Sequence, residues 1–126
     1  MIVGIGTDIV ALERIEGLLQ RREDAFARRV LHALELEQFQ LSSQRTAFLA
    51  KRFAAKEAAA KALGTGIAQG LSWQHIRVGH DEWGAPSLHF TEAAAARAKS
   101  LGVVSTHLSL SDEQGYAVAF VVLESD

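Results

Sequence analysis

The stretch FLAKRFAAKEAAAKALGTGI, residues 48–67, decides the fold because it is built almost entirely from alanine and other strong helix formers. Ser42 or Ser43 fits the N-cap position ahead of it, and Gly64 supplies the usual C-terminal stop. The pattern therefore predicts a long helix that ends at Leu63. A flexible Gly-Thr-Gly loop follows this helix.

Upstream of the long helix, the sequence predicts one strand and two helices. Ile2 to Val10 is rich in β-branched residues, and strand alternation places Asp8 and two glycines on one face. From Glu13 to Val30, apolar residues recur at helical spacing, which predicts a single helix. A short second helix is expected from Leu34 to Leu41.

Downstream, turn residues and β-rich runs predict two hairpins separated by a helix. The predicted strands are His75–Gly79, Ser87–Phe90, Ser105–Ser111 and Tyr116–Leu123, and the helix begins after Thr91 and stops at Gly102. The order strand, helices, hairpin, helix, hairpin indicates an α+β fold in which a mainly antiparallel sheet packs on the long helix.

The length and composition of the chain exclude several classes of protein. The chain has 126 residues, 48% of them hydrophobic, a formal net charge of -2 and no cysteine. This length predicts a single domain over residues 1–126. Disulfide scaffolds, zinc ribbons, iron–sulfur centres and cysteine nucleophiles are excluded. Because the N-terminus has no basic leader and no apolar run nears the roughly 20 residues that cross a bilayer, we expect a cytoplasmic protein without a membrane partner.

Charge is distributed unevenly along the chain. Residues 45–61 hold five basic side chains and one acidic one, whereas residues 1–44 hold five against seven and residues 62–126 three against seven. The local excess of positive charge predicts a phosphate-bearing partner near residues 45–61, and not general nucleic-acid binding. A solvated helix face is the alternative.

Two carboxylates and a lysine form the candidate catalytic group. Glu57 and Lys61 are four residues apart on the long helix and share one face. Asp8 comes from the first strand, beside Gly4 and Gly6. Two carboxylates from separate elements are a common way to hold Mg²⁺, which takes phosphate oxygens as further ligands. Such a site suits phosphoryl transfer, with the lysine neutralising charge on the transferred group.

Sequence spacing alone does not exclude simpler explanations for these features. Glu57 and Lys61 also fit an ordinary surface ion pair. The Gly-Thr-Gly loop also fits a helix cap and turn, and it matches neither a P-loop nor a dinucleotide fingerprint. In the functional interpretation, Arg45, Arg52 or Lys56 hold more distant phosphates.

A basic stripe follows the first predicted helix. Arg14, Leu18, Arg21, Ala25 and Arg28 recur at alternating spacings of four and three. The stripe is either a solubilising face or a docking surface for an acidic helix, whose affinity would depend on salt.

The residues GIGTDIVALERI at 4–15 and FLAKRFAAKEAAAKALGTGI at 48–67 together resemble the two signature blocks of holo-[acyl-carrier-protein] synthases, the short bacterial type of 4'-phosphopantetheinyl transferase. The resemblance continues through GLSWQHIRV at 70–78, GAPSLHF at 84–90 and HLSLSDEQGYAVAFVVLE at 107–124. It therefore covers essentially the whole chain in order and implies a 4'-phosphopantetheinyl transferase-like fold.

This resemblance implies transfer of 4'-phosphopantetheine from coenzyme A to a serine of apo-acyl carrier protein, in support of fatty acid biosynthesis, with release of adenosine 3',5'-bisphosphate. It implies Mg²⁺ bound by Asp8 and Glu57, with Lys61 supporting the pyrophosphate or assisting proton movement. Around coenzyme A it places Arg45, Arg52, Lys56, Gly64, Thr65, Gly66, Pro86 and His107.

The resemblance also assigns Arg14, Leu18, Arg21 and Arg28 to the carrier protein, and it implies a homotrimer with active sites at subunit interfaces. One departure concerns Asp112, which stands where many relatives have histidine, so no role of that histidine carries over.

Two other classes of function remain as alternatives. A non-catalytic nucleotide or coenzyme A binding module would depend on the arginines and lysines, whereas a transferase requires both carboxylates. A purely structural interaction subunit would depend on neither coenzyme A nor metal.

Overall fold

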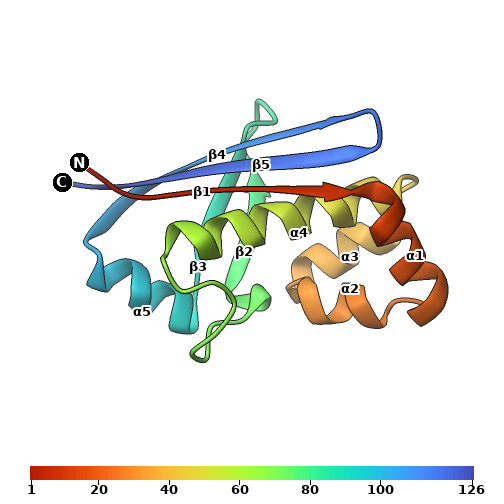
Figure 1. Cartoon of the computed structure of the whole chain (residues 1–126), viewed down its shortest axis with the longest axis horizontal. Coiled ribbons are helices and arrows are strands. Elements are labelled where there is room, and N and C mark those ends of the chain that lie inside the picture. Colours follow the sequence, from red (N-terminus) through yellow and green to blue (C-terminus); the bar gives the residue numbers. More distant parts are fainter.

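The computed structural model describes all of residues 1–126 (Figure 1). In chain order the elements are β1 (Ile2–Ala11), α1 (Leu12–Arg22), α2 (Ala25–Val30), α3 (Ala33–Leu41), α4 (Arg45–Ala62), the 3₁₀ turn η1 (Trp73–His75), β2 (Ile76–His80), β3 (Pro86–Phe90), α5 (Glu92–Ser100), β4 (Val103–Glu113) and β5 (Tyr116–Ser125).

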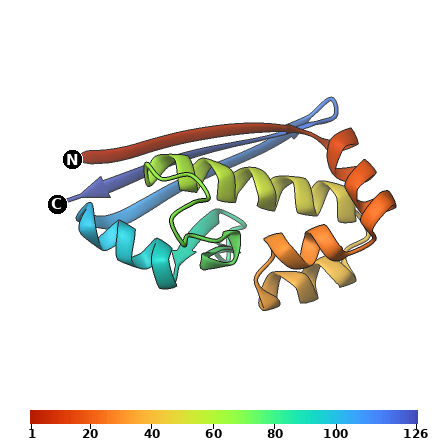
Figure 2. The ribbon, with the colours of Figure 1, turned by 60° about the horizontal axis from the view of Figure 1, so that its bottom comes forward.

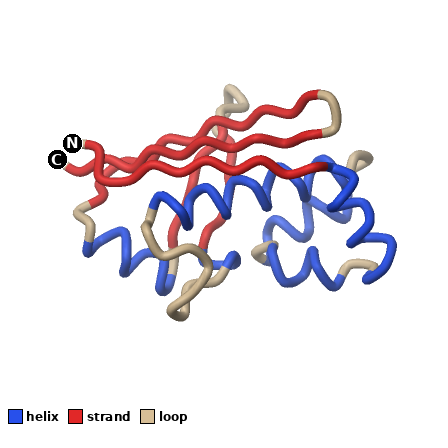
Figure 3. The backbone as a smooth tube through the Cα atoms, viewed as in Figure 1, coloured by secondary structure: helices blue, strands red, loops and turns tan.

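The strands form two antiparallel sheets. One has three strands in the order β1-β5-β4, and the other is the β2-β3 hairpin. The long sheet lies along α4, and the two chain ends lie side by side at one end of it (Figure 3). The predicted α+β class, with antiparallel strands packed on a long helix, is confirmed, although the strands divide between two sheets.

Helix α4 is the centre of the core. Eleven of its 18 residues are buried, most of them alanine, because the helix is covered on several sides. The glycines of β1 permit this packing: a Cβ at Gly4 would lie 2.1 Å from the carbonyl oxygen of Ala62, and one at Gly6 would lie 2.0 Å from that of Ala58. Small residues on both sides therefore bring the backbones of β1 and α4 together.

Helices α1 to α3 gather at the start of α4, and α5 lies near its end (Figure 2). The prediction of one helix from Glu13 to Val30 is wrong. The chain turns at Glu23, whose φ is 51°, and α2 begins at Ala25. Asp24, in this turn, is paired with Arg45 at 2.6 Å. This ion pair joins the turn to the start of α4 across 21 residues, a contact that local sequence did not reveal.

Two smaller boundaries also differ from the predictions. The N-cap of α4 is Gln44, not Ser42 or Ser43. The Ser42 hydroxyl instead accepts a hydrogen bond from the Gln44 backbone N–H at 3.1 Å. The β4-β5 turn contains only Gln114 and Gly115, both with positive φ, as a two-residue type I′ turn requires. The strands therefore extend further than expected. No helix in the chain is both long and apolar enough to cross a membrane.

Candidate active site

Strand β1 and helix α4 bring Asp8 and Lys61 into contact. The Lys61 ammonium donates to Asp8 Oδ1 at 3.1 Å and to the carbonyl oxygen of Thr7 at 3.0 Å. The Lys61 side chain is 52% exposed and that of Asp8 only 17%. The close packing of β1 on α4 therefore places the mostly buried carboxylate of Asp8 beside the exposed ammonium of Lys61.

Glu57 lies one turn before Lys61 on α4 and is partly buried. Its Oε1 accepts a hydrogen bond from the indole Nε1 of Trp73 at 3.0 Å. Asp8 Oδ2 and Glu57 Oε2 accept no hydrogen bond within the chain. No group of three or more Asp, Glu, His or Cys side chains forms a metal site. Asp8 and Glu57 each keep one carboxylate oxygen without a hydrogen-bond partner. Such oxygens fit Mg²⁺, a cation that keeps several waters and takes one or two carboxylates.

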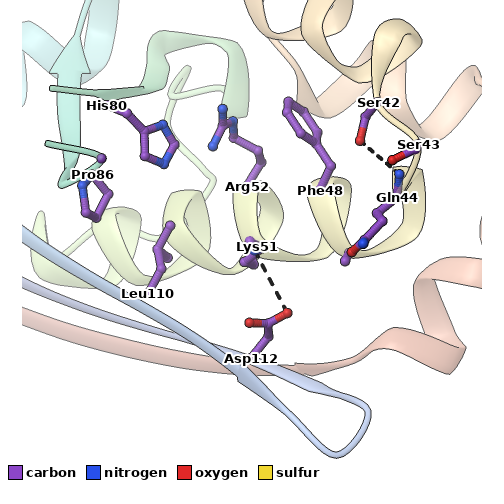
Figure 4. A pocket seen from close by; sticks show the side chains of 12 residues that line it. Ser42, Ser43, Gln44, Phe48, Lys51, Arg52, His80, Pro86, Leu110 and Asp112 are labelled. Atoms are coloured by element: carbon purple, nitrogen blue, oxygen red, sulfur yellow. Dashed lines mark hydrogen bonds and ion pairs between the residues drawn. The ribbon is translucent and has the colours of Figure 1, made fainter. Parts of the chain in front are cut away.

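A cavity of about 510 Å³ opens beside the first half of α4 (Figure 4). Arg52, from α4, lies in it between His80 and Phe48, and Pro86 from β3 forms part of its wall. Opposite them, Asp112 of β4 faces the Lys51 ammonium at 3.9 Å. The structure thus brings two predicted coenzyme A residues, Arg52 and Pro86, into one pocket.

The pocket is electropositive. Burial lowers the pKa of Arg52, an effect opposed by the charge of Glu35, and the Arg52 Nε atom is buried without a hydrogen-bond partner. Burial also lowers the pKa of His80, with further lowering from the positive charges of Arg52 and Lys51. An anion bound in this pocket would contact the Arg52 guanidinium, which packing holds in place. It would also stabilise the charged form of the His80 imidazole.

Glu35 anchors a buried network that the sequence did not reveal. Its carboxylate is 1% exposed, accepts from Lys56 Nζ at 2.5 Å and from the Val78 backbone N–H at 2.9 Å, and lies 3.6 Å from Arg52 Nε. The only local signal is the capping box that Glu35 forms with His32. The partners come from α4 and β2, so only the tertiary structure identifies the network.

Lys56, which the sequence interpretation placed near coenzyme A, lies in the core of the folded chain. Its side chain is completely buried, and its ammonium binds Glu35 and the carbonyl oxygen of Trp73. Burial lowers its pKa, against the effect of Glu35. Two of its three N–H donors are therefore used inside the core, where the lysine stabilises the folded framework.

Other predicted nucleotide residues lie apart from the pocket. Arg45 is at the start of α4, where it pairs with Asp24 and covers the ring of Phe39 at 4.3 Å. The loop Gly64–Gly66 follows the other end, roughly 27 Å away for an 18-residue helix. Within one chain, the predicted coenzyme A residues therefore do not all line a single pocket.

His107 lies on the opposite face of the sheet from Asp8. Alternation and register place it beside Val122, whereas Asp8 pairs with Ala119 on the face toward α4. The ring Nε2 of His107 is hydrogen-bonded to Glu124 Oε1 at 2.5 Å, which lowers the pKa of Glu124. Within one chain, the imidazole thus lies outside the Asp8–Lys61 site.

The break between α1 and α2 reshapes the basic stripe into a groove of about 400 Å³. Arg14, Leu18 and Arg21 line it from α1, and Phe26 and Arg29 line it from α2. The predicted member Arg28 faces an adjacent hollow that contains Asp24. Arg29 and the aromatic Phe26, which the stripe omitted, are brought in by the change of direction at Glu23.

Comparison with known proteins identifies the class. The sequence pattern of the 4'-phosphopantetheinyl transferase superfamily matches residues 4–121, and the chain belongs to this superfamily. The expected resemblance to holo-[acyl-carrier-protein] synthases is confirmed by individual relatives. The holo-[acyl-carrier-protein] synthase of Shewanella baltica (strain OS155 / ATCC BAA-1091) is 55% identical over 124 residues, 98% of each chain.

Solved structures agree with this assignment. The holo-[acyl-carrier-protein] synthase of Neisseria meningitidis superposes with a TM-score of 0.93 at 46% identity, covering 99% of this chain and 100% of that one. The Bacillus anthracis enzyme of the same name, in complex with CoA (3',5'-ADP), has a TM-score of 0.83 at 41% identity and covers 100% of this chain and 99% of its own.

Proposed function

We propose that this chain transfers the 4'-phosphopantetheine group of coenzyme A to a serine of an apo-acyl carrier protein, releases adenosine 3',5'-bisphosphate, and does so with Mg²⁺. Family membership and relatives that cover the whole chain support the reaction. The observation that carries the chemistry is the juxtaposition of Asp8 and Lys61, with Glu57 one turn away. We further propose that the reaction supports fatty acid biosynthesis in the cytoplasm.

The carboxylates are the proposed cation ligands. Asp8 and Glu57 would hold Mg²⁺ through their free oxygens, and the bound cation would polarise the attacked phosphoryl group. Lys61 has its own role: its ammonium is exposed and adjacent to Asp8, so it can contact a pyrophosphate oxygen and offset charge that develops during in-line displacement. The carrier serine supplies the nucleophilic oxygen, whose proton must leave during the attack.

The pocket beside α4 is the proposed site for a distal phosphate of coenzyme A. Arg52 offers a guanidinium that packing has already fixed over Phe48, at 4.4 Å from the ring, so little side-chain freedom is lost on binding. Lys51 adds a second positive charge, and Pro86 forms part of the wall. The Gly64–Gly66 loop and Arg45 stay in the proposed coenzyme A set.

The groove between α1 and α2 is the proposed docking surface for the carrier protein. Its arginines, Arg14, Arg21 and Arg29, suit an acidic helix, and Leu18 and Phe26 supply apolar contact. Arg28 borders this groove and adds to its positive field.

A homotrimer with active sites at subunit interfaces completes the proposal. The face of the long sheet that points away from α4 exposes Ile5, Ile9 and Phe120, by 61%, 62% and 43%. A contiguous exposed apolar face of this kind is typical of an interface. His107 lies on this same face, so it would reach the nucleotide only in a neighbouring subunit.

Paired variants test the proposal against a simple binding module. Asp8→Ala and Glu57→Ala should remove phosphopantetheine transfer and leave coenzyme A binding within a few fold. Arg52→Ala should weaken coenzyme A binding instead. If both carboxylate variants still transfer the group at the wild-type rate, the proposed cation ligands are wrong.

A further inference from the structure

Trp73 is attached to helix α4 through two consecutive residues. Its indole Nε1 donates to Glu57 Oε1 at 3.0 Å, and its carbonyl oxygen accepts from Lys56 Nζ at 3.1 Å. The η1 turn that carries Trp73 is closed by reciprocal hydrogen bonds between Ser72 and His75. Both the backbone and the indole of Trp73 are therefore held relative to Glu57.

An aromatic cluster fixes the plane of the indole. The ring centroid of Trp73 lies 5.7 Å from that of Phe53 and 6.3 Å from that of Phe26, the latter nearly edge-on at 70°. The Arg29 guanidinium lies over the indole ring, 5.9 Å from its centroid. These three contacts restrict rotation of the ring, so its N–H stays directed toward the carboxylate.

We propose that Trp73 is a positioning residue for Glu57: its N–H fixes Oε1 so that Oε2 remains directed to a divalent cation. This inference rests on the proposed function, in which Glu57 is a Mg²⁺ ligand. Hydrogen-bond partners outside the ligand set orient carboxylate ligands, and their loss typically weakens metal affinity 10- to 100-fold. Trp73 touches no reacting atom and acts only through Glu57.

The chain offers a matched control for this residue. It has two tryptophans, and the second, Trp83, is 87% exposed in the loop between β2 and β3. Trp73→Phe keeps an aromatic ring in the cluster and removes the N–H donor. Trp83→Phe makes the same chemical change at an exposed indole that makes no hydrogen bond to Glu57, and it leaves Trp73 as the sole fluorescent tryptophan.

The experiment is a calorimetric titration of Mg²⁺ into wild-type, Trp73→Phe and Trp83→Phe protein, each saturated with coenzyme A, with thermal unfolding to verify the fold. We expect Trp73→Phe to bind Mg²⁺ about tenfold more weakly than wild type and Trp83→Phe to match wild type. Transfer assays should show the same shift in half-saturating Mg²⁺, with KM for coenzyme A unchanged.

Equal Mg²⁺ affinity in folded Trp73→Phe and wild type would overturn the inference. A second readout does not require replacing Trp73: in Trp83→Phe, Mg²⁺ binding should change the Trp73 emission, and an unchanged emission at calorimetric saturation would also contradict it. The proposed function is judged separately, because it fails only if the wild-type protein shows no Mg²⁺-dependent transfer.

Discussion

The Lys61 ammonium lies 3.1 Å from Asp8 Oδ1 and joins the helix of one signature block to the strand of the other. The two residues are 53 positions apart in the sequence. Their contact depends on Gly4 and Gly6, which let β1 approach the alanine face of α4. The architecture of the core and the geometry of the site therefore have the same cause.

Replacement of Lys61 should impair chemistry more than coenzyme A binding. Loss of one positioned charge that stabilises a transition state typically lowers kcat about 10²- to 10³-fold. We expect Lys61→Ala to show a fall of this order, with Lys61→Arg retaining part of the activity because its charge persists. Steady-state kinetics with a carrier protein provide the measurement. A drop in affinity for coenzyme A at constant kcat would contradict the assigned role.

Gly6→Ala should destabilise the fold. The added Cβ would lie 2.0 Å from the carbonyl oxygen of Ala58, so β1 and α4 must separate. Overpacking of a core typically costs about 1–3 kcal/mol, and backbone against backbone leaves little room for relief. We therefore expect a loss of roughly 3 kcal/mol or more in urea unfolding.

Gly17→Ala is the matched control for this prediction. There the new Cβ would meet only the flexible end of the Arg21 side chain, at 3.0 Å, and alanine is the better helix former. Its free energy of unfolding should equal or slightly exceed the wild-type value. Equal stability of both alanine variants would refute the close-packing account.

Glu35→Gln should destabilise the protein strongly. The substitution leaves Lys56 buried without its counter-ion, and breaking a buried ion pair from one side typically costs about 3–5 kcal/mol. Glu37→Gln, on the exposed side of the same helix, should stay within about 0.5 kcal/mol of wild type. Urea denaturation measures both changes. A near-neutral Glu35→Gln would show that the buried network is not essential to the fold.

His80 should make stability depend on pH. In the folded state, the pKa of His80 is lowered by burial and by the positive charges of Arg52 and Lys51, while Asp81 opposes this shift. The unfolded chain therefore binds more protons than the folded chain just below pH 6.5. Stability attributable to His80 is therefore complete above pH 6.5 and decreases as the pH falls toward the folded pKa. Chemical unfolding at pH 7.5 and 5.5 should show a smaller loss for His80→Gln than for wild type. Identical losses would exclude this assignment.

Phe120→Glu should disrupt assembly. The substitution places a charge in the apolar sheet face that also carries Ile5 and Ile9, and a buried unpaired charge opposes association. We expect wild type to sediment as a trimer and the variant as a monomer, with transfer reduced. Lys99→Glu, an exposed change on α5, serves as the control. A wild-type protein that sediments as a monomer while fully active would contradict shared active sites.

Local sequence patterns predicted most of the helices and strands because residues close in the sequence determine them. Alanine content and Gly64 predicted α4, and strand alternation placed Asp8 on the face that meets it. Asp24, beside the break at Glu23, pairs with Arg45, and Lys56 pairs with Glu35; the two partners in each pair are 21 positions apart. Distant pairs of this kind leave no periodic signal, so the buried network and the shape of the basic groove emerged only from the folded chain.

The central claim is best tested by intact-protein mass spectrometry of an apo-acyl carrier protein incubated with this protein and coenzyme A, with Mg²⁺ present or removed by a chelator. The account predicts that the carrier gains the mass of one phosphopantetheine group only when Mg²⁺ is present. A carrier that stays unmodified with Mg²⁺, across several carriers and with coenzyme A binding verified, would contradict it and favour a binding module.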